Sequence, residues 1–428
     1  MNRKLFLLIF CFTLIKYSHA QSWQSLGGGA SFSVYALAVD SVRDELYVGG
    51  WFDRVGSTYV NGIAKWDGLN WHVLNGGVNA GGSVKTILIY NNEVYVGGNF
   101  DSIGGIAANN VARWDHNRWH PVGQGFNDNV NCLVLHNGEI FAGGSFNYSG
   151  TDTVLFVAKW NGSKWMCRGK GLTGDAITLF SNTSDLLAGG LFGSKIWLDT
   201  IWNTLGSQLG GKIYSYYNYG TELFTSGNFQ TSTWPYKRFI AKWANNDWQT
   251  YTYPLTSGTL DPGIRSMTEY NGSLIITGHF NTPKNIGIYS PLTLDSLSAG
   301  ISGPGLCLTT FRGDLIVGGL FSFAGNQVAG TSNLARWTLN TNISTLTPYQ
   351  IFKIQYGNNS FYRNIPFECI SGNCQIEIYN LLGQKVNALV NNSRNQIFIP
   401  KTSGGIHLIR VNNKHHTFIL KIFLSENL

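Results

Sequence analysis

Apolar and β-branched residues come in short runs along most of the chain, and small polar residues separate these runs. The stretch from residue 84 to 122 has four such runs, Val84–Tyr90, Glu93–Phe100, Asn110–Asp115 and Arg118–Val122. They are rich in residues that favour strands. Asn91-Asn92 joins the first two runs and His116-Asn117 joins the last two, and both dipeptides suit tight hairpin turns. The stretch therefore predicts four antiparallel strands.

This arrangement recurs along the chain and is marked by a box of the form small-Gly-x-Phe. The box occurs seven times, at Gly49–Phe52, Gly97–Phe100, Gly143–Phe146, Gly189–Phe192, Ser226–Phe229, Thr277–Phe280 and Gly318–Phe321. A second marker is a pair of tryptophans five residues apart, at Trp66/Trp71, Trp114/Trp119, Trp160/Trp165, Trp197/Trp202 and Trp243/Trp248. The first Trp follows the box Phe by 14 residues in repeats one, two, three and five. Spacing this constant predicts one structural unit used repeatedly.

Four antiparallel strands in about 47 residues are typical of a propeller blade, so the repeats predict an all-β, seven-bladed β-propeller. Blades pack on both faces, and the glycine pair of the box is expected to let its strand approach a neighbour closely. The fourth repeat is short, and the sixth has Ile288-Tyr289 in place of the tryptophan pair. Six or eight blades therefore remain open alternatives.

The first strand of the propeller is expected to complete the last blade. The seventh repeat contains Trp337 but no second tryptophan five residues later. Trp23 precedes Phe52 by 29 residues, as Trp71 precedes Phe100. The N-terminal strand would then supply the fourth strand of the last blade and remove an exposed sheet edge.

The first 20 residues have the three-part pattern of a secretory signal, with cleavage expected after Ala20. Arg3 and Lys4 precede the apolar run Leu5–Ile15, and Ser18-His19-Ala20 is a small-x-small site. A run of 11 residues is too short for a membrane anchor, which needs about 20. No later segment is long enough to span a membrane. We therefore expect a signal peptide (1–20), a propeller (21–347), and a linker with a C-terminal domain (348–428).

The formal charge of +7 is unevenly divided. Residues 1–20 contribute +3, residues 21–349 contribute −1 from 19 basic and 20 acidic residues, and residues 350–428 contribute +5 from 8 basic and 3 acidic residues. The propeller is therefore nearly neutral and lacks the basic surface that nucleic-acid binding requires. We expect no nucleic-acid partner.

The cysteines and histidines give no pattern of a cofactor site. The five cysteines after residue 20 are too scattered for a disulfide framework, although Cys369 and Cys374 are close enough for one local bridge. The other three, Cys132, Cys167 and Cys307, are expected to pack as small buried groups. The propeller histidines fall mostly at turns or outer strands, and neither a Gly-x-Ser-x-Gly elbow nor a Cys/His nucleophile pattern occurs. We therefore expect no metal, no cofactor and no catalytic residues.

The glycine box with a downstream tryptophan resembles kelch-type propellers. The fuller pattern, Gly-Gly-x-Phe-Asp-x-Ile/Val-Gly followed by Ala-Arg-Trp-Asp, is more similar to repeats of bacterial extracellular propellers and fungal cortical polarity markers. Trp66-Asp67 and Trp114-Asp115 occur without the Gly-His partner of WD repeats, so the WD family is not the expected one. The resemblance implies an architecture and little about function, because propellers host many activities.

Residues 350–428 resemble the type A sorting domain of the type IX secretion system of Bacteroidota. The matching segments are Gln375–Val386 with Leu382-Gly383, Ile397–Pro400, Ser403–Val411 with Gly405, and Lys421. The usual Pro-Asn-Pro opening is absent near Tyr356, and His407 replaces the usual tyrosine. The resemblance implies a small antiparallel β-sandwich, secretion machinery as its partner, and a secreted or outer-surface protein. An ordinary C-terminal β-sandwich is the alternative.

Long loops are expected on one face of the propeller, and such loops usually carry binding residues. Its candidate binding residues are Asp53, Arg54, Asp101, Trp234, Tyr236 and Arg238. They suit a glycan or protein ligand, whereas the alternative is that they pack or cap the loops locally. The sequence therefore favours a non-catalytic binding propeller. A polysaccharide lyase or hydrolase and a structural spacer without a ligand remain the alternatives.

Overall fold

The computed structural model describes residues 21–182, 184–207, 209–230, 238–250, 262–281, 284–290 and 294–339, and strands between residues 357 and 424. The described residues contain strands and turns and no helix. The chain divides into two compact units, Met1–Asn340 and Thr341–Leu428.

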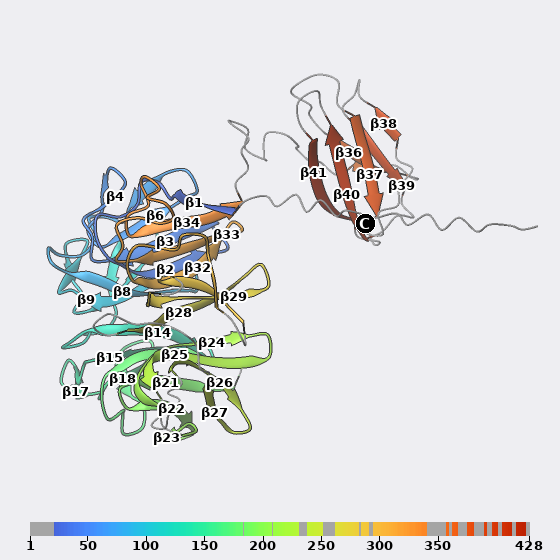
Figure 1. The fold of residues 1–428 in the computed structure, drawn as a ribbon. Coiled ribbons are helices and arrows are strands. Elements are labelled where there is room, and N and C mark those ends of the chain that lie inside the picture. Colours follow the sequence, from blue (N-terminus) through green and yellow to red (C-terminus); the bar gives the residue numbers. More distant parts are fainter. Residues whose placement is uncertain are drawn as a thin grey trace, which may run out of the picture. The chain divides into compact units, whose positions relative to one another are not determined.

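The first unit is a propeller of seven four-stranded antiparallel sheets (Figure 1). Blades 1 to 4 are β2(Val34–Asp40), β3(Glu45–Gly50), β6(Ile63–Trp66), β7(Trp71–Val73); β8(Ser83–Tyr90), β9(Glu93–Asn99), β12(Val111–Trp114), β13(Trp119–Pro121); β14(Val130–His136), β15(Glu139–Gly144), β18(Val157–Trp160), β19(Trp165–Cys167); and β20(Ala176–Ser181), β21(Leu186–Gly190), β22(Gly193–Leu198), β23(Ile201–Thr204). Blades 5 to 7 are β24(Gly210–Tyr219), β25(Glu222–Gln230), β26(Arg238–Ala244), β27(Asp247–Thr250); β28(Gly263–Tyr270), β29(Ser273–His279), β30(Ile286–Tyr289), β31(Leu294–Ser296); and β32(Gly305–Phe311), β33(Asp314–Gly319), β34(Leu334–Leu339), β1(Gln21–Ser25). The first strand of each blade contacts the first strand of the next, so these inner strands form a closed ring.

The predicted closure is confirmed. Strand β1 pairs antiparallel with β34, and Trp23 lies opposite Trp337 with 5.2 Å between their ring centroids. Figure 1 shows β1, in blue, beside β34, in orange. The chain start thus covers the edge that the last blade would otherwise leave open.

The two irregular repeats form complete blades, which settles the number of blades at seven. In blade 4, Leu191-Phe192 is all that separates β21 from β22. In blade 6, Tyr289 lies opposite Leu294 at the place of the tryptophan pair. An aromatic–aliphatic cross-strand pair therefore fills this position without a second indole.

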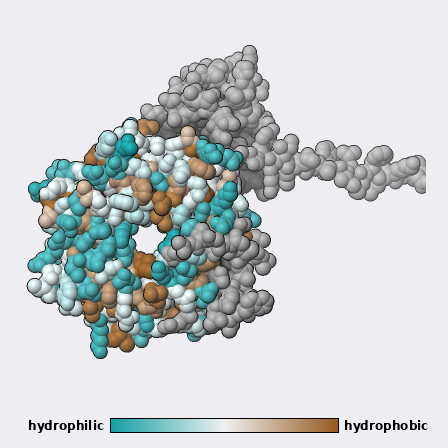
Figure 2. Space-filling model, turned by 60° about the vertical axis from the view of Figure 1, so that its left-hand side comes forward, coloured by the Kyte–Doolittle hydropathy of each residue, from teal (hydrophilic) through white to brown (hydrophobic). Residues whose placement is uncertain are grey.

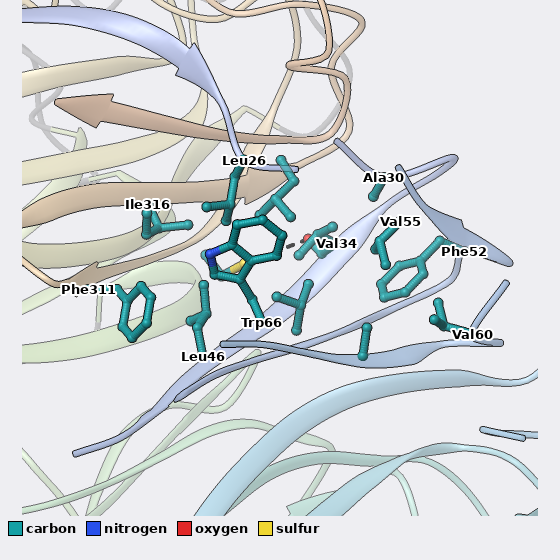
Figure 3. Packing of buried hydrophobic residues seen from close by; sticks show 14 residues of the cluster. Leu26, Ala30, Val34, Leu46, Phe52, Val55, Val60, Trp66, Phe311 and Ile316 are labelled. Atoms are coloured by element: carbon teal, nitrogen blue, oxygen red, sulfur yellow. Dashed lines mark hydrogen bonds between the residues drawn. The ribbon is translucent and has the colours of Figure 1, made fainter. Parts of the chain in front are cut away.

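The tryptophan pairs are cross-strand neighbours on the outer two strands of a blade. Their ring centroids are 4.9 Å apart in Trp66/Trp71 and 5.4 Å apart in Trp197/Trp202. The second indole also connects blades, since Trp119 Nε1 donates to the Leu74 carbonyl of the preceding blade at 2.8 Å. Equivalent bonds of 3.0 and 2.9 Å run from Trp165 to Val122 and from Trp248 to Leu205. Figure 3 shows Trp66 inside the core that blades 7 and 1 share.

The two glycines of the box face different neighbours. All seven repeats have Gly at the second position, where a Cβ would lie well inside 3.0 Å of a carbonyl oxygen at the start of the inner strand of the same blade. At the first position, a Cβ on Gly97 would lie 2.5 Å from Val130 Cγ1 of the next blade. Because the first position faces a side chain, Ser226 and Thr277 replace glycine there in blades 5 and 6. The close approach expected of the glycine pair is confirmed.

Each inner strand carries a β-bulge near its start. The residue that follows the bulge is small in every blade, and these residues are Ala36, Thr86, Cys132, Thr178, Ser215, Ser266 and Cys307. Each lies opposite the first residue of the box, for example Cys132 opposite Gly143. Of the three cysteines expected to pack as small buried groups, Cys307 is buried, and Cys132 and Cys167 are half-buried against the core. Cys369 and Cys374 lie outside the described residues.

The second unit has two described sheets. One contains β35(Gly357–Asn358), β36(Tyr362–Pro366), β39(Gln396–Pro400) and β38(Leu389–Asn391), and the other β37(Gln375–Asn380), β40(Gly405–Asn412) and β41(Thr417–Leu424). Gly405 begins β40, and Lys421 of β41 lies opposite Leu408. Leu382 and Gly383 lie outside the described residues.

Candidate binding face

The loops between the second and third strands of blades 1 to 3 fold into small hairpins. These are β4(Arg54–Val55) with β5(Thr58–Tyr59), β10(Ser102–Ile103) with β11(Ile106–Ala107), and β16(Tyr148–Ser149) with β17(Asp152–Thr153). Each hairpin lies against the segment that enters its blade, as the bridges Ala30–Val55 and Val78–Ile103 show for blades 1 and 2. The loops between the second and third strands and the segments that join one blade to the next therefore lie on one face of the propeller, as expected. We call it the long-loop face.

In blades 1, 2, 3 and 7, a side-chain oxygen of the entering segment caps the loop between the second and third strands. Ser31 Oγ accepts hydrogen bonds from the backbone nitrogens of Asp53 and Arg54, both at 3.2 Å. Asn79 Oδ1 accepts from the backbone nitrogens of Asp101 and Ser102 at 3.0 and 3.3 Å. Asn127 and Ser302 do the same in blades 3 and 7. The entering segments thus satisfy these backbone donors, so the carboxylates of Asp53 and Asp101 are not needed to cap the turns.

Three asparagines, buried in blades 2 and 7 and half-buried in blade 6, fix the loops to the next blade. Asn110 Oδ1 accepts from Phe100 N at 3.0 Å, and its Nδ2 donates to the Phe126 carbonyl at 2.9 Å. Asn285 and Asn333 make the corresponding pairs of bonds in blades 6 and 7. All three have positive φ, which Asn tolerates better than most residues. The long-loop face is therefore a rigid support for the side chains that it presents.

The structure brings two of the six predicted binding residues together. Asp53 Oδ1 accepts a 2.6 Å hydrogen bond from Ser31 Oγ and lies 3.7 Å from Arg54 Nε. The Arg54 guanidinium lies 5.4 Å from the ring centroid of Tyr59. Asp101 lies on the next blade. Trp234 and Tyr236 fall outside the described residues, as does the side chain of Arg238 at the start of β26.

Two exposed aromatic residues of blade 1 escaped the sequence analysis. Phe32 and Trp51 are 44% and 47% exposed, and their rings meet edge to face with centroids 4.7 Å apart. Trp51 is the third residue of its box, a position where the other repeats have Asn, Ser, Leu or His. A search for residues that are constant among the repeats misses Trp51. A comparison of the third box residue, which varies among the repeats, would have found it.

An open hollow of about 630 Å³ lies between blades 6 and 7 on the long-loop face. It is lined by Asn281, Lys284, Asn285, Ala299, Ile301, Ser302, Phe323, Gly325, Asn326 and Gln327. A smaller one of about 270 Å³ on blade 5 is lined by Gly210, Asn228, Phe229, Gln230, Phe239 and Pro262. Neither set of lining residues, taken from the part of the chain that the structure describes, contains a carboxylate, a histidine or a cysteine.

Figure 2 shows an opening through the middle of the propeller, which the ring of inner strands surrounds. Lys85, the bulge residue of blade 2, reaches toward blade 3, where its Nζ donates to Asn129 Oδ1 at 2.8 Å and to Asn131 Oδ1 at 3.3 Å. Burial lowers the pKa of Lys85, while the carboxylates of Asp128 and Asp175 oppose this shift. The lysine therefore ties two blades together.

Among the described residues, no group of three or more histidine, cysteine, aspartate or glutamate side chains is arranged to hold a metal ion. His72 and His120 each bond an aspartate at a turn between outer strands, Asp67 at 2.6 Å and Asp115 at 2.7 Å. Burial raises the pKa of the Cys132 thiol to about 12, so it is no nucleophile.

No helix that is long and apolar enough to cross a membrane occurs in the described residues.

Comparison with known proteins identifies the tail. Residues 352–425 match the family model described as a secretion system C-terminal sorting domain. The search of curated proteins gives no match. Among solved structures, the WD40 β-propeller domain of Doa1 is similar with a TM-score of 0.50 and 13% sequence identity, covering 74% of this chain and 97% of that chain. This likeness shows the fold alone. The chain is thus a seven-bladed β-propeller with a type IX sorting tail, which implies handling by the type IX secretion system and a place outside the cell or on its outer surface.

Proposed function

We propose that the propeller is a non-catalytic recognition module that binds an extracellular glycan or protein through its long-loop face. Residues 1–20 act as a signal peptide cleaved after Ala20, and residues 348–428 form a linker and a sorting β-sandwich that the type IX machinery of a bacterium of the phylum Bacteroidota reads. The propeller itself, residues 21–347, is of the kelch-like kind found in bacterial extracellular proteins.

The hollow between blades 6 and 7 carries this proposal. Its lining offers amide and hydroxyl groups, one lysine and the ring of Phe323. Glycoside hydrolysis usually needs two carboxyl groups beside the scissile bond, and acid–base chemistry needs a titratable group near neutral pH. Among the lining residues that the structure describes, Lys284 alone is titratable, so these residues suit hydrogen bonding and stacking rather than bond cleavage.

A structural spacer would present a flat polar face without a pocket. A hollow of about 630 Å³ and the exposed aromatic residues of blade 1 argue for a ligand instead.

The test is a screen of the purified protein on glycan and peptide arrays, with product analysis for every polysaccharide that it binds. The informative variant is Phe323→Ser, because blade 2 has Ser102 at the same place in its hairpin. The matched control is Tyr148→Ser, which alters this position in blade 3. Binding without turnover that is lost in Phe323→Ser supports the proposal. Release of shortened products overturns it in favour of an enzyme, and silence on both arrays overturns it in favour of a spacer.

A further inference from the structure

In blade 1, one aromatic residue of the box is exposed to solvent and the adjoining aromatic residue is buried. Phe52 is 5% exposed and packs in the core with Val55 and Val60 (Figure 3). Trp51 is 47% exposed and faces the edge of Phe32, with an interplanar angle of 79°. Edge-to-face contact is a favourable arrangement for two rings, so each ring supports the other at the surface.

The fold does not need a tryptophan at this position. The other blades place Asn99, Ser145, Leu191, Asn228, His279 and Leu320 there. Ser145 keeps the backbone bond of Trp51, because Ser145 N donates to Asn129 O at 3.0 Å as Trp51 N donates to Ser33 O at 2.9 Å. The indole surface that remains in water adds little to stability, since stabilisation scales with the apolar area that is buried. That surface is available to a ligand.

Backbone hydrogen bonds on both sides hold the segment that carries Phe32. Ser31 N donates to Arg54 O at 3.0 Å, and Ser33 O accepts from Trp51 N. The two rings are therefore held in place before any ligand arrives, which lowers the entropy lost on binding.

Planar polar groups belong to the same corner of blade 1. Ser31, next to Phe32, donates through its hydroxyl to Asp53, and Arg54 lies beside that carboxylate. The side chains of Asp53 and Arg54 are 62% and 48% exposed, so both are accessible from the solvent. A carboxylate accepts several hydrogen bonds and a guanidinium donates up to five. Their charges cancel, which makes the corner polar without a net charge.

This combination has the chemistry of a carbohydrate site. One face of a pyranose ring presents C–H groups that suit the negative face of an indole, and its hydroxyls suit a carboxylate and a guanidinium. We propose that Trp51 and Phe32 form the stacking platform of a carbohydrate site on blade 1, which the Asp53–Arg54 pair completes and which takes a neutral polysaccharide. The inference goes beyond the proposed function, because it places a ligand site on blade 1 whose residues are not among those that line the hollow between blades 6 and 7.

The surroundings favour a neutral glycan over the other ligands of the array screen. An anionic polysaccharide would gain no net attraction here, because the charges of Asp53 and Arg54 cancel and the propeller segment 21–349 has 19 basic and 20 acidic residues. A protein partner would need a larger apolar core to its interface. Among the other exposed aromatic and apolar residues of this face, Tyr59 belongs to blade 1 and lies against Arg54, whereas Tyr148 and Leu191 belong to other blades.

The experiment is calorimetric titration of the purified full chain with four neutral oligosaccharides, namely hexamers of β-1,4-glucose, mannose, xylose and N-acetylglucosamine. Trp51→Asn installs the residue that blade 2 uses at the same place, so the variant is expected to fold. The matched control is Leu320→Asn, at the same position in blade 7 and 44% exposed. We expect at least one hexamer to bind, Trp51→Asn to raise its Kd about tenfold or more, Phe32→Ala to raise it less, and the control to change it less than about twofold.

The outcomes separate this inference from the proposed function. If a hexamer binds and Trp51→Asn leaves its Kd unchanged while Phe323→Ser raises it, the platform is wrong and the recognition module stands. If none of the four hexamers binds, the carbohydrate site is refuted. If the Trp51→Asn variant instead loses a peptide ligand found on the array, blade 1 binds a protein and the inference fails. Unfolding midpoints of all variants in urea check that each loss is local.

Discussion

Replacement of the second box glycine should harm the propeller far more than replacement of the first, although both lie in the same strand. In blade 2 these are Gly98 and Gly97. A Cβ on Gly98 would lie well inside 3.0 Å of the Ser83 carbonyl oxygen, and 3.0 Å from both Ser83 C and Val84 Cα. All three atoms belong to the backbone of β8, which pairs with β9 at this point. Relief therefore requires the two strands to move apart and to weaken their own hydrogen bonds.

At Gly97, the neighbours are side-chain atoms. Its Cβ would lie 2.5 Å from Val130 Cγ1 and 2.9 Å from Thr86 Cγ2. Rotamer changes relieve part of such a clash. Overpacking of this kind typically costs about 1–3 kcal/mol. We expect Gly97→Ala at the lower end of this range and Gly98→Ala at about 3 kcal/mol or more, because only backbone movement relieves the second clash.

The assay is urea denaturation followed by tryptophan fluorescence, with comparison of midpoints and slopes. Gly174→Ala is the matched control, because Gly174 has no positive φ and its Cβ would lie 3.9 Å from the nearest atom, Phe192 Cδ1. Addition of Val130→Ala should restore much of the stability lost in Gly97→Ala and none of that lost in Gly98→Ala. Equal midpoints for Gly98→Ala and Gly174→Ala would refute the steric explanation of the box.

Three further results are expected. Hydrogen bonds from His72 and from the backbone of Asn70 and Leu69 hold the pKa of Asp67 well below its usual range, so ionised Asp67 stabilises the fold above about pH 4 and this stabilisation is lost as the pH falls toward the lower folded-state pKa. Urea midpoints measured between pH 7 and pH 2.5 should therefore fall less steeply in Asp67→Asn than in the wild type, and identical profiles would contradict this. Trp119→Phe should lower the free energy of unfolding by about 1 kcal/mol more than Trp202→Phe, because Trp119 Nε1 donates to Leu74 O at 2.8 Å whereas the buried Trp202 Nε1 has no partner among the described residues. Equal free energies of unfolding would show that the indole hydrogen bond does not stabilise the contact between blades. Burial raises the pKa of Cys132 to about 12, so a maleimide at pH 7.5 should label this thiol in urea and not in the native protein. Peptide mass mapping would locate the label, and rapid labelling of the native protein would mean that the inner strand opens.

The number of blades and the closure were predictable because the same steric conditions recur in each blade. A carbonyl oxygen faces the second box residue seven times, so the sequence has glycine there seven times. The tryptophan pair recurs because, in five blades, one outer-strand indole faces another across the hairpin of the third and fourth strands. The pairing of Trp23 with Trp337 could be inferred from the spacing of the tryptophans and box phenylalanines. Conditions that repeat in space leave repeats in the sequence.

The candidate site was less predictable because it uses positions that do not repeat. Arg54 and Asp53 were expected on the long-loop face, but their relation to Ser31 depends on how the entering segment lies against the hairpin. The hollow combines loops of blades 6 and 7, whose facing side chains no single repeat contains. Phe32 lies between the repeats altogether.

The box itself separates scaffold from function by position. Its second residue faces backbone and tolerates glycine alone, whereas its first faces a side chain and tolerates Ser226 or Thr277. Its third residue, Trp51 in blade 1, bonds Ser33 through its backbone nitrogen, while its side chain is half exposed and contacts Phe32. A propeller can therefore gain or lose a ligand group at this third position without a change in the packing of its blades. It follows that the third residues of the boxes, read around the ring, are the first place to look for the specificity of propellers built on this repeat.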